Sequence, residues 1–165
     1  MVTHYRKKIS LGVGSSWSRF MNKLSVSARM KLVKQKDTKP EMVVRRLLHK
    51  IGLRFRLHVR ELPGTPDISL PKHETVIFVH GCFWHRHPCC RYASIPKTRQ
   101  EFWLPKFATN VERDIRKATQ LREMGWRVLT VWECETKDVI ELQARLSSEF
   151  FPDPAHPSAV ECSDR

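Results

Sequence analysis

Apolar residues recur at helical spacing in the first strongly patterned segment of the chain, DTKPEMVVRRLLHKIG at residues 37–52. Thr38 can cap the start of a helix, and Glu41, three residues later, can complete a capping box. Gly52 offers a left-handed stop at the other end. The apolar positions between them are Val44, Leu47, Leu48 and Ile51. The pattern therefore predicts an amphipathic helix between Thr38 and Gly52.

Three strands are predicted next. The segment LRFRLHV (53–59) alternates apolar and basic residues, as a half-buried strand does. PGTPDISL (63–70) indicates a turn that leads into a short strand, and PKHE (71–74) indicates a second turn. TVIFVH (75–80) is almost wholly apolar and rich in β-branched residues, which is typical of a central strand buried on both faces.

The second half of the chain predicts a helix, a strand and a closing helix. The segment NVERDIRKATQLREMG (110–125) repeats apolar residues on one helical face and stops at Gly125. WRVLTVWEC (126–134) predicts a buried strand, and residues 138–150 predict an amphipathic helix. The apolar face of the first of these helices carries Val111, Ile115, Ala118, Leu121 and Met124. The order of elements predicts an α/β fold, with a mixed central sheet flanked by helices.

Composition narrows the class of protein. Thirty Lys and Arg against seventeen Asp and Glu give a formal net charge of +13, which favours a polyanionic partner such as nucleic acid over a basic protein that merely stays soluble. No apolar run is long enough to cross a bilayer and no secretory signal is recognisable, so we expect a soluble intracellular protein. We expect a mobile basic arm over residues 1–24, one domain over 25–150 and a disordered tail over 151–165.

A metal site is predicted by the stretch HGCFWHRHPCC at residues 80–90. Five cysteines, an odd number, suit thiolate ligands in a reducing compartment better than a disulfide framework, and Cys162 in the tail is excluded from any site. Structural zinc takes four Cys or His ligands. A distant ligand, Cys134, follows an apolar strand and would pin the loop to the end of that strand. The loop itself offers His80, Cys82, His85, His87, Cys89 and Cys90, so counting alone leaves the ligand set open.

A hydrolytic site is predicted beside it. Asp67 in a Pro-Asp turn, Glu41 on the first helix and the apolar strand that follows resemble the core of restriction-type nucleases, in which carboxylates place Mg²⁺. Those cores usually continue with an acid, one residue and a lysine, whereas this strand ends FVHG. A backbone carbonyl such as that of Val79 would then complete the oxygen shell of the metal, and His80 or His85 would serve as the base.

The motifs together resemble a family, the very-short-patch mismatch repair DNA endonucleases (Vsr), from about Ser25 to about Leu146. The resemblance implies a restriction-endonuclease-like fold with a structural zinc. It also implies nicking of one DNA strand on the 5′ side of the thymine in T:G mismatches that arise when 5-methylcytosine deaminates. The matching blocks are RMKLVKQKDTKPE, RFRLHVRELPGTPDI, VIFVHGCFWHRH, PKTRQEFWLPKF, NVERD and LREMGWRVLTVWEC.

The same resemblance implies roles for the catalytic candidates. Asp67 would bind Mg²⁺ with the backbone carbonyl of Val79, at a position where family members have threonine. His85 would activate the attacking water, and Glu41 and His80 would support the site.

Zinc would be held by Cys82, His87, Cys134 and one of two adjacent cysteines. We favour Cys90 over Cys89, because many relatives carry a small residue at the position of Cys89.

The resemblance also implies a wedge that enters the duplex beside the mismatch, formed by Phe83, Trp84 and Met30. The partner would be double-stranded DNA with a T:G mismatch, bound by a monomer in the bacterial cytoplasm at the nucleoid, with repair-pathway proteins acting later. Two alternatives stay open. One is a dimeric restriction-type endonuclease that cuts matched duplex, and the other is a zinc-containing DNA-binding module without catalysis.

Overall fold

The computed structural model describes residue 34 and residues 36–152 of the 165-residue chain. Contacts divide the chain after Gln35, and the architecture below is that of the unit that begins at Lys36. The expected arm, nearly all of the expected tail, Met30 and Cys162 lie outside the described residues, so what was predicted for them stays a prediction. None of the helices within the described ranges has the length and hydropathy needed to cross a membrane.

A four-stranded mixed sheet forms the centre of this unit, with strand order β1-β2-β3-β4. The first two pairs are antiparallel, and β3 and β4 are parallel. The predicted mixed sheet flanked by helices is confirmed. The strands are β1 (Arg56–Leu57), β2 (Ile68–Leu70), β3 (Thr75–His80) and β4 (Arg127–Trp132). The helices are α3 (Lys39–Lys50), α4 (Gln100–Glu123) and α5 (Val139–Phe150), with short 3-10 turns η1 (Pro71–His73) and η2 (Glu135–Lys137).

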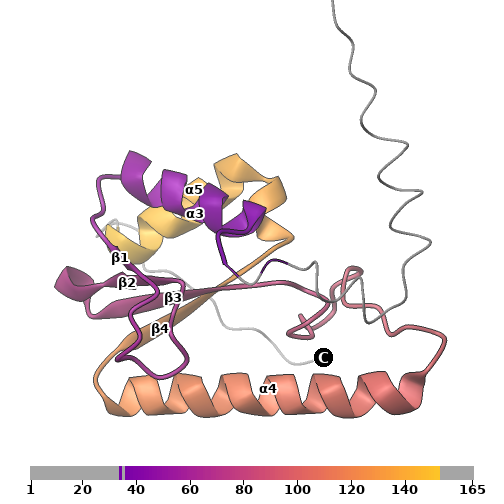
Figure 1. The fold of residues 1–165 in the computed structure, drawn as a ribbon. Helices are drawn as coiled ribbons and strands as arrows, with labels where there is room; N and C mark the ends of the chain where they lie inside the picture. Colours follow the sequence, from indigo (N-terminus) through magenta and orange to yellow (C-terminus); the bar gives the residue numbers. More distant parts are fainter. Residues whose placement is uncertain (1–33, 35, 153–165) are drawn as a thin grey trace, which may run out of the picture. The chain divides into compact units, whose positions relative to one another are not determined.

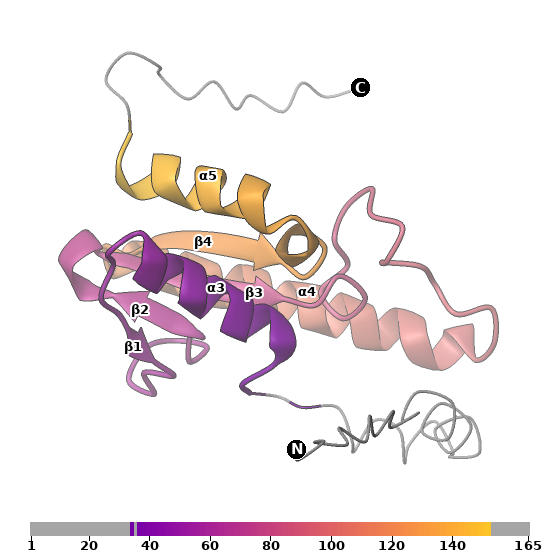
Figure 2. The ribbon, with the colours of Figure 1, turned by 90° about the horizontal axis from the view of Figure 1, so that it is seen from above.

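The two faces of the sheet are covered by different helices. Helices α3 and α5 lie on one face, and the long helix α4 runs along the other (Figures 1 and 2). The larger core joins α3 and α5 to the sheet through buried aliphatic side chains. Its fully buried members include Val44, Leu48, Ile68, Ile77, Val131 and Leu146. The smaller core under α4 is formed by Leu62, Val76 and Leu121.

Helix α3 has the predicted start and stop. The Thr38 hydroxyl accepts from the Glu41 amide at 3.4 Å, and the Glu41 carboxylate accepts from the Thr38 amide at 3.2 Å, which completes the capping box. Gly52 has a φ of +87°, and its amide donates to the carbonyl of His49. Glycine adopts this left-handed conformation without steric cost, so the chain leaves the helix here.

Helix α4 is ten residues longer at its start than the predicted helix at 110–125, because it begins at Gln100. The added segment has a buried face of its own, with residues spaced by four and three positions as in a helix. These residues are Trp103, Phe107 and Asn110. Pro105 lies inside the helix and removes one backbone donor, but it is exposed and near the first turns.

The inward face of α4 also differs from the predicted one. Leu121 is fully buried as expected, but Ile115 is 62% exposed and Met124 is 54% exposed. The inward face follows residues 103, 107, 110, 114 and 121, and Ile115 is rotated by about 100° from position 114. The predicted apolar face therefore does not coincide with the buried face of the helix at Ile115 and Met124.

Two strands differ from their predicted extents. The strand predicted over 53–59 is reduced to the edge strand β1, because His58 has a left-handed φ of 47° and ends it. The strand predicted over 126–134 is β4, which lies at the other edge of the sheet and is mostly half-buried. Strand β3 extends over the predicted 75–80 and is buried along its first half, with neighbours on both sides.

Candidate active site and metal centre

The parallel pairing of β3 and β4 brings two distant parts of the chain to one edge of the sheet. His80 pairs with Trp132, the last residue of each strand, and the Glu133 amide donates to the His80 carbonyl at 2.9 Å. Cys82 and Cys134 each follow two residues later. Because parallel strands end at the same edge, the histidine- and cysteine-rich loop meets the end of β4 there.

Three thiols and one imidazole converge at this edge. Ligand atoms of Cys82, His87, Cys90 and Cys134 all lie within 4.8 Å of one another. His87 Nδ1 is 3.7 Å from Cys82 Sγ and 3.4 Å from Cys134 Sγ. Two ligands on a tetrahedral zinc lie about 3.5 Å apart when one is nitrogen and the other sulfur, so the donor set and its spacing fit zinc. We call these four residues the Cys/His cluster.

The two adjacent cysteines, Cys89 and Cys90, lie in different environments. Cys90 belongs to the Cys/His cluster, whereas Cys89 is exposed and has a left-handed φ of 55°. The loop is further folded by hydrogen bonds from the His87 amide to the Cys82 carbonyl and from the Cys90 amide to the His87 carbonyl. This geometry includes Cys90 in the Cys/His cluster and leaves Cys89 outside it.

The thiols of the Cys/His cluster differ in acidity. Burial raises the pKa of the Cys82 thiol to about 12 and also raises the pKa of Cys134. A hydrogen bond from the Tyr92 backbone amide, and then contacts with the other two thiols, lower the pKa of Cys90. Thiolate is the form that binds metal, so a divalent cation held here would favour deprotonation of all three groups.

A second convergent group includes His80 itself. The rings of His80 and His85 stack at a centroid distance of 3.9 Å, with an interplanar angle of 8°. His85 Nδ1 lies 2.5 Å from Asp114 Oδ2, so helix α4 supplies a carboxylate to the loop. This arrangement directs the other ring nitrogen of His85, Nε2, away from the carboxylate. We call these three residues the His/Asp cluster.

Burial and charge set the protonation states in the His/Asp cluster. Burial, followed by the neighbouring His85, lowers the pKa of His80 to about 3, so His80 is neutral at physiological pH. Partial burial alone would raise the pKa of Asp114, but the hydrogen bond to His85, together with the electrostatic influence of His85 and of the Arg113 guanidinium, outweighs it. The pKa of Asp114 is therefore lowered, and the group is a carboxylate.

Asp67 directly precedes β2 and lies beside the end of β3. Its Oδ2 accepts a hydrogen bond from the Val79 amide at 2.8 Å, and no hydrogen bond in the described part of the chain engages Oδ1. The carbonyl of His80 points toward β4, and carbonyls alternate along a strand, so the Val79 carbonyl faces the same side as its amide, toward Asp67. Burial is the main cause that raises the pKa of Asp67. Oxygen donors in this arrangement suit a hard divalent cation, which would favour the charged carboxylate.

Both carboxylate oxygens of Glu41 already accept hydrogen bonds, unlike those of a free catalytic carboxylate. One of its oxygens accepts from the amide and hydroxyl of Thr38, and the other accepts from the Asp37 amide and from Arg45 at 2.8 Å. Its side chain is 4% exposed, and its negative charge contributes to the raised pKa of Asp67. Arg45 also contacts Asp37 and His58. The structure thus places Glu41 near Asp67 as the centre of a helix-capping network.

An aromatic group lies between the loop and the start of α4. Phe83 contacts Trp84, Trp103 and Phe107 in edge-to-face geometry, at centroid distances of 5.0, 5.5 and 5.1 Å. Phe83 and Trp84 are half-buried, whereas Trp103 and Phe107 are buried. The side-chain amide of Asn110 donates to the Trp84 carbonyl at 3.2 Å. The predicted wedge pair is therefore braced on α4.

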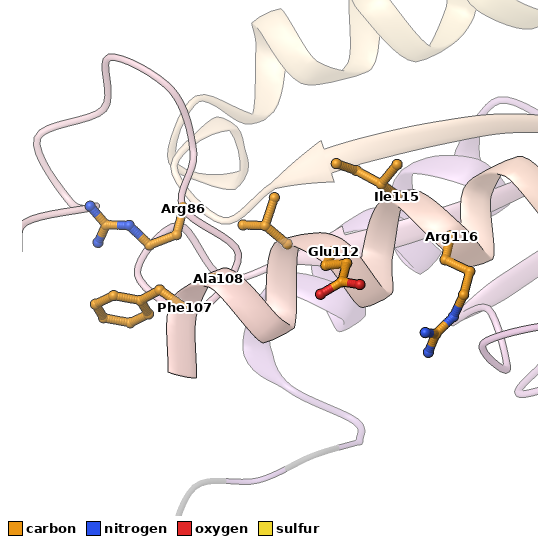
Figure 3. A pocket seen from close by; sticks show the side chains of 7 residues that line it. Arg86, Phe107, Ala108, Glu112, Ile115 and Arg116 are labelled. Atoms are coloured by element: carbon orange, nitrogen blue, oxygen red, sulfur yellow. The ribbon is translucent and has the colours of Figure 1, made fainter. Parts of the chain in front are cut away.

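An open hollow adjoins this aromatic group on the outer face of α4 (Figure 3). Arg86 lies over the Phe107 ring at 4.5 Å from its centroid, and Glu112 and Arg116 lie further along the helix. No member of the Cys/His or His/Asp cluster lines it. The hollow is therefore separate from the chemistry described above.

Two residues of this edge were not predicted from the sequence. Asp114 is the third member of the His/Asp cluster, and Trp103 extends the aromatic group. A signal for Asp114 was present, because it stands three residues after Val111 and four before Ala118, as a carboxylate on the apolar stripe of the helix. Trp103 was hidden because the helix was predicted to begin only at Asn110.

Comparisons with known proteins agree with the motifs. Residues 20–91 match the model of the family described as DNA mismatch endonuclease Vsr. The type II nicking enzyme V.XorIIP of Xanthomonas oryzae pv. oryzae is 52% identical over 123 residues, which cover 74% of this chain and 90% of the relative. The DNA mismatch endonuclease Vsr of Escherichia coli is 47% identical over 113 residues, which cover 68% of this chain and 72% of the relative.

Among solved structures, the catalytic domain of the homing endonuclease I-Bth0305I aligns with a TM-score of 0.47 and 24% identity, covering 68% of this chain and 93% of that chain. The family predicted from the motifs is confirmed by the sequence relatives. The chain belongs to the Vsr family of DNA mismatch endonucleases.

Proposed function

We propose that this DNA endonuclease nicks one strand of duplex DNA on the 5′ side of the thymine in a T:G mismatch, as a step in very short patch repair. The observation that carries the proposal is the geometry at the end of β3. The Val79 amide donates to Asp67 there, and the next residue, His80, stacks on His85, which is bonded to Asp114. The likeness to the E. coli DNA mismatch endonuclease Vsr supports the mismatch as the substrate.

The Asp67 carboxylate and the Val79 carbonyl are the groups that would hold Mg²⁺. When bound there, Mg²⁺ supplies a positive charge that stabilises the developing charge on the scissile phosphate. The Asp67 carboxylate is oriented to bind a cation. The Val79 amide fixes Oδ2, and Oδ1 has no hydrogen bond among the described residues.

His85 is the proposed general base. Asp114 accepts the Nδ1 proton of His85, which leaves Nε2 with a free lone pair to take a proton from the attacking water. The carboxylate also stabilises the imidazolium that forms. His80 remains neutral and stacks on His85, so it supports the plane of that ring without adding a charge.

The role proposed for Glu41 is indirect. Its carboxylate is already bonded to the helix start and to Arg45, so it orders the segment that faces Asp67. It supports the site through position and charge.

The Cys/His cluster is proposed to hold a structural zinc. Four such ligands close the coordination shell, which is typical of structural sites. The bound metal would fix the loop that carries both His85 and the aromatic pair.

The substrate is proposed to be double-stranded DNA bound by a monomer, in the bacterial cytoplasm at the nucleoid. The net charge of +13 favours the phosphate backbone. Phe83 and Trp84, braced on α4, are the proposed wedge, together with Met30 outside the described residues. Unstacking costs least at a mispair, so such a wedge favours mismatched sites.

The test is nicking of a labelled duplex that carries one T:G pair within a panel of randomised flanks, in Mg²⁺. We expect a single nick, on the thymine strand, immediately 5′ of the thymine. The same panel with T:A and C:G pairs is the control. Equal cleavage of both strands of matched duplex would instead support a restriction-type enzyme. Tight binding with no cleavage would support a DNA-binding module.

Asp114→Asn should lower kcat by about 10²-fold, because the amide holds His85 in the wrong tautomer and does not stabilise its charged form. Single-turnover nicking of the T:G duplex measures the effect. Glu112→Gln is the matched control, since Glu112 is an exposed carboxylate on the same helix and should nick like the wild type. An Asp114→Asn protein with wild-type kcat would contradict the proposed base.

A further inference from the structure

Trp132, the last residue of β4, contacts a member of each cluster. Its ring stacks on His87 of the Cys/His cluster at a centroid distance of 4.2 Å, with an interplanar angle of 6°. It also meets His80 of the His/Asp cluster edge-on, at 5.5 Å and 67°. The indole is half-buried between the two. It therefore separates the candidate metal centre from the candidate catalytic group while contacting both.

The contacts form one continuous row of rings. His87 stacks on Trp132, Trp132 contacts His80, His80 stacks on His85 at 3.9 Å, and His85 is bonded to Asp114. Packed flat rings have few alternative orientations, because a tilt of one ring opens a gap or a clash at the next. The plane of His85 is thus constrained on one side by Asp114 and on the other by this row.

The backbone of Trp132 is held independently of the loop. Its amide donates to Glu135 Oε2 at 2.6 Å, and Arg145 of α5 binds Glu135 and also donates to the Thr130 carbonyl at 3.1 Å. The parallel register pairs Trp132 with His80. The backbone that carries the indole is therefore held by the sheet and by α5, and the rings of His87 and His80 pack against the indole.

We propose that Trp132 is a positioning residue that sets the orientation of the catalytic histidine pair and transmits the state of the Cys/His cluster to it. The inference rests on the proposed function, because it concerns the same nicking site. It assigns to Trp132 a contribution to the chemical step without any contact to the reacting phosphate. It also predicts that a change in the position of the His87 ring alters the orientation of the His85 ring.

The first test compares Trp132→Leu and Trp132→Phe with Trp126→Leu and Trp126→Phe. Trp126 precedes the same strand, is also half-buried, and packs on the smaller core. Trp132→Leu should lower kcat on the T:G duplex by about tenfold or more, with the Kd for the duplex within about twofold, because misorientation of a catalytic group affects the chemical step. Trp132→Phe, which keeps a flat ring, should recover most of that loss. Both Trp126 variants should keep kcat. A wild-type kcat in Trp132→Leu, or an equal loss in Trp126→Leu, would overturn the proposal.

The second test needs no nicking activity. Histidine ring NMR signals are compared between zinc-loaded and cadmium-loaded protein, since cadmium is a larger ion that also prefers thiolate ligands. In the wild type, the exchange should shift the signals of His87, His80 and His85. In Trp132→Leu, the shifts should be confined to His87. Shifts of His80 and His85 that persist in Trp132→Leu, or that are absent in the wild type, would overturn the transmission. This result stands whether or not the wild type nicks T:G duplex, so failure of the proposed function is distinguished from failure of this inference.

Discussion

Replacing Asp67 by asparagine is expected to reduce nicking of a T:G duplex by about 10³-fold or more, with little change in affinity for the duplex. The reason is the loss of the carboxylate that faces the Val79 carbonyl, since charge stabilisation by a bound metal contributes several kcal/mol to a phosphodiester transition state. Affinity is retained because it depends mainly on the many basic side chains. Single-turnover nicking and a binding titration in Ca²⁺ measure the two quantities separately.

The asparagine variant should fold normally. Its side-chain oxygen can still accept from the Val79 amide, and burial already disfavours the charged form of Asp67. Asp138→Asn is the matched control, because Asp138 caps α5 and asparagine caps a helix about as well. If Asp67→Asn kept more than about a tenth of the wild-type rate, the assignment of Asp67 as the metal-binding carboxylate would be wrong.

Removal of the proposed zinc is expected to have the second large effect. Chelation should lower the midpoint of thermal unfolding by about 10 °C or more, because the free energy of metal binding is added to the free energy of folding. The Cys/His cluster joins the loop at 82–90 to the end of β4, so its loss frees two segments that are distant in sequence. Calorimetry with and without chelator, alongside metal analysis, measures the effect.

The adjacent cysteines provide the matched pair for this prediction. Cys90→Ser should lose bound zinc and the associated stability, whereas Cys89→Ser should retain both, since Cys89 is exposed and outside the cluster. A thermal midpoint that is unchanged by chelation would disprove the structural metal. Loss of zinc from Cys89→Ser alone would disprove the choice of Cys90.

Local sequence patterns predicted the parts of the fold that depend on local physics. The capping box of Thr38 and Glu41, the stop at Gly52 and the apolar strand at 75–80 are each determined by neighbouring residues, and each appears as predicted. The predicted strand at 53–59 was too long, for a local reason that the alternation of apolar and basic residues does not reveal. A left-handed residue, His58, interrupts an otherwise regular alternation.

The parts that could not be predicted depend on contacts between elements. The first ten residues of α4 are helical because Trp103 and Phe107 pack against the loop aromatics, and this contact outweighs the helix-breaking tendency of Pro105. Asp114 acquires its place only when α4 lies against the loop that carries His85. Thr38 was predicted as a partner of Glu41, but the hydrogen bonds of Glu41 with Arg45 and with the Asp37 amide were not.

The parallel pairing of β3 with β4 has a consequence for how the protein is made. A chain emerging from the ribosome presents Asp67, His85 and Asp114 before residues 127–134 have been added, and synthesis proceeds at only about 5–20 residues per second. Until that last strand docks, His80 lacks its neighbour, and the loop lacks both Cys134 and Trp132. A prematurely terminated product therefore carries every proposed catalytic side chain but no ordered site. We therefore expect chains that end before Arg127 to be inactive as nucleases.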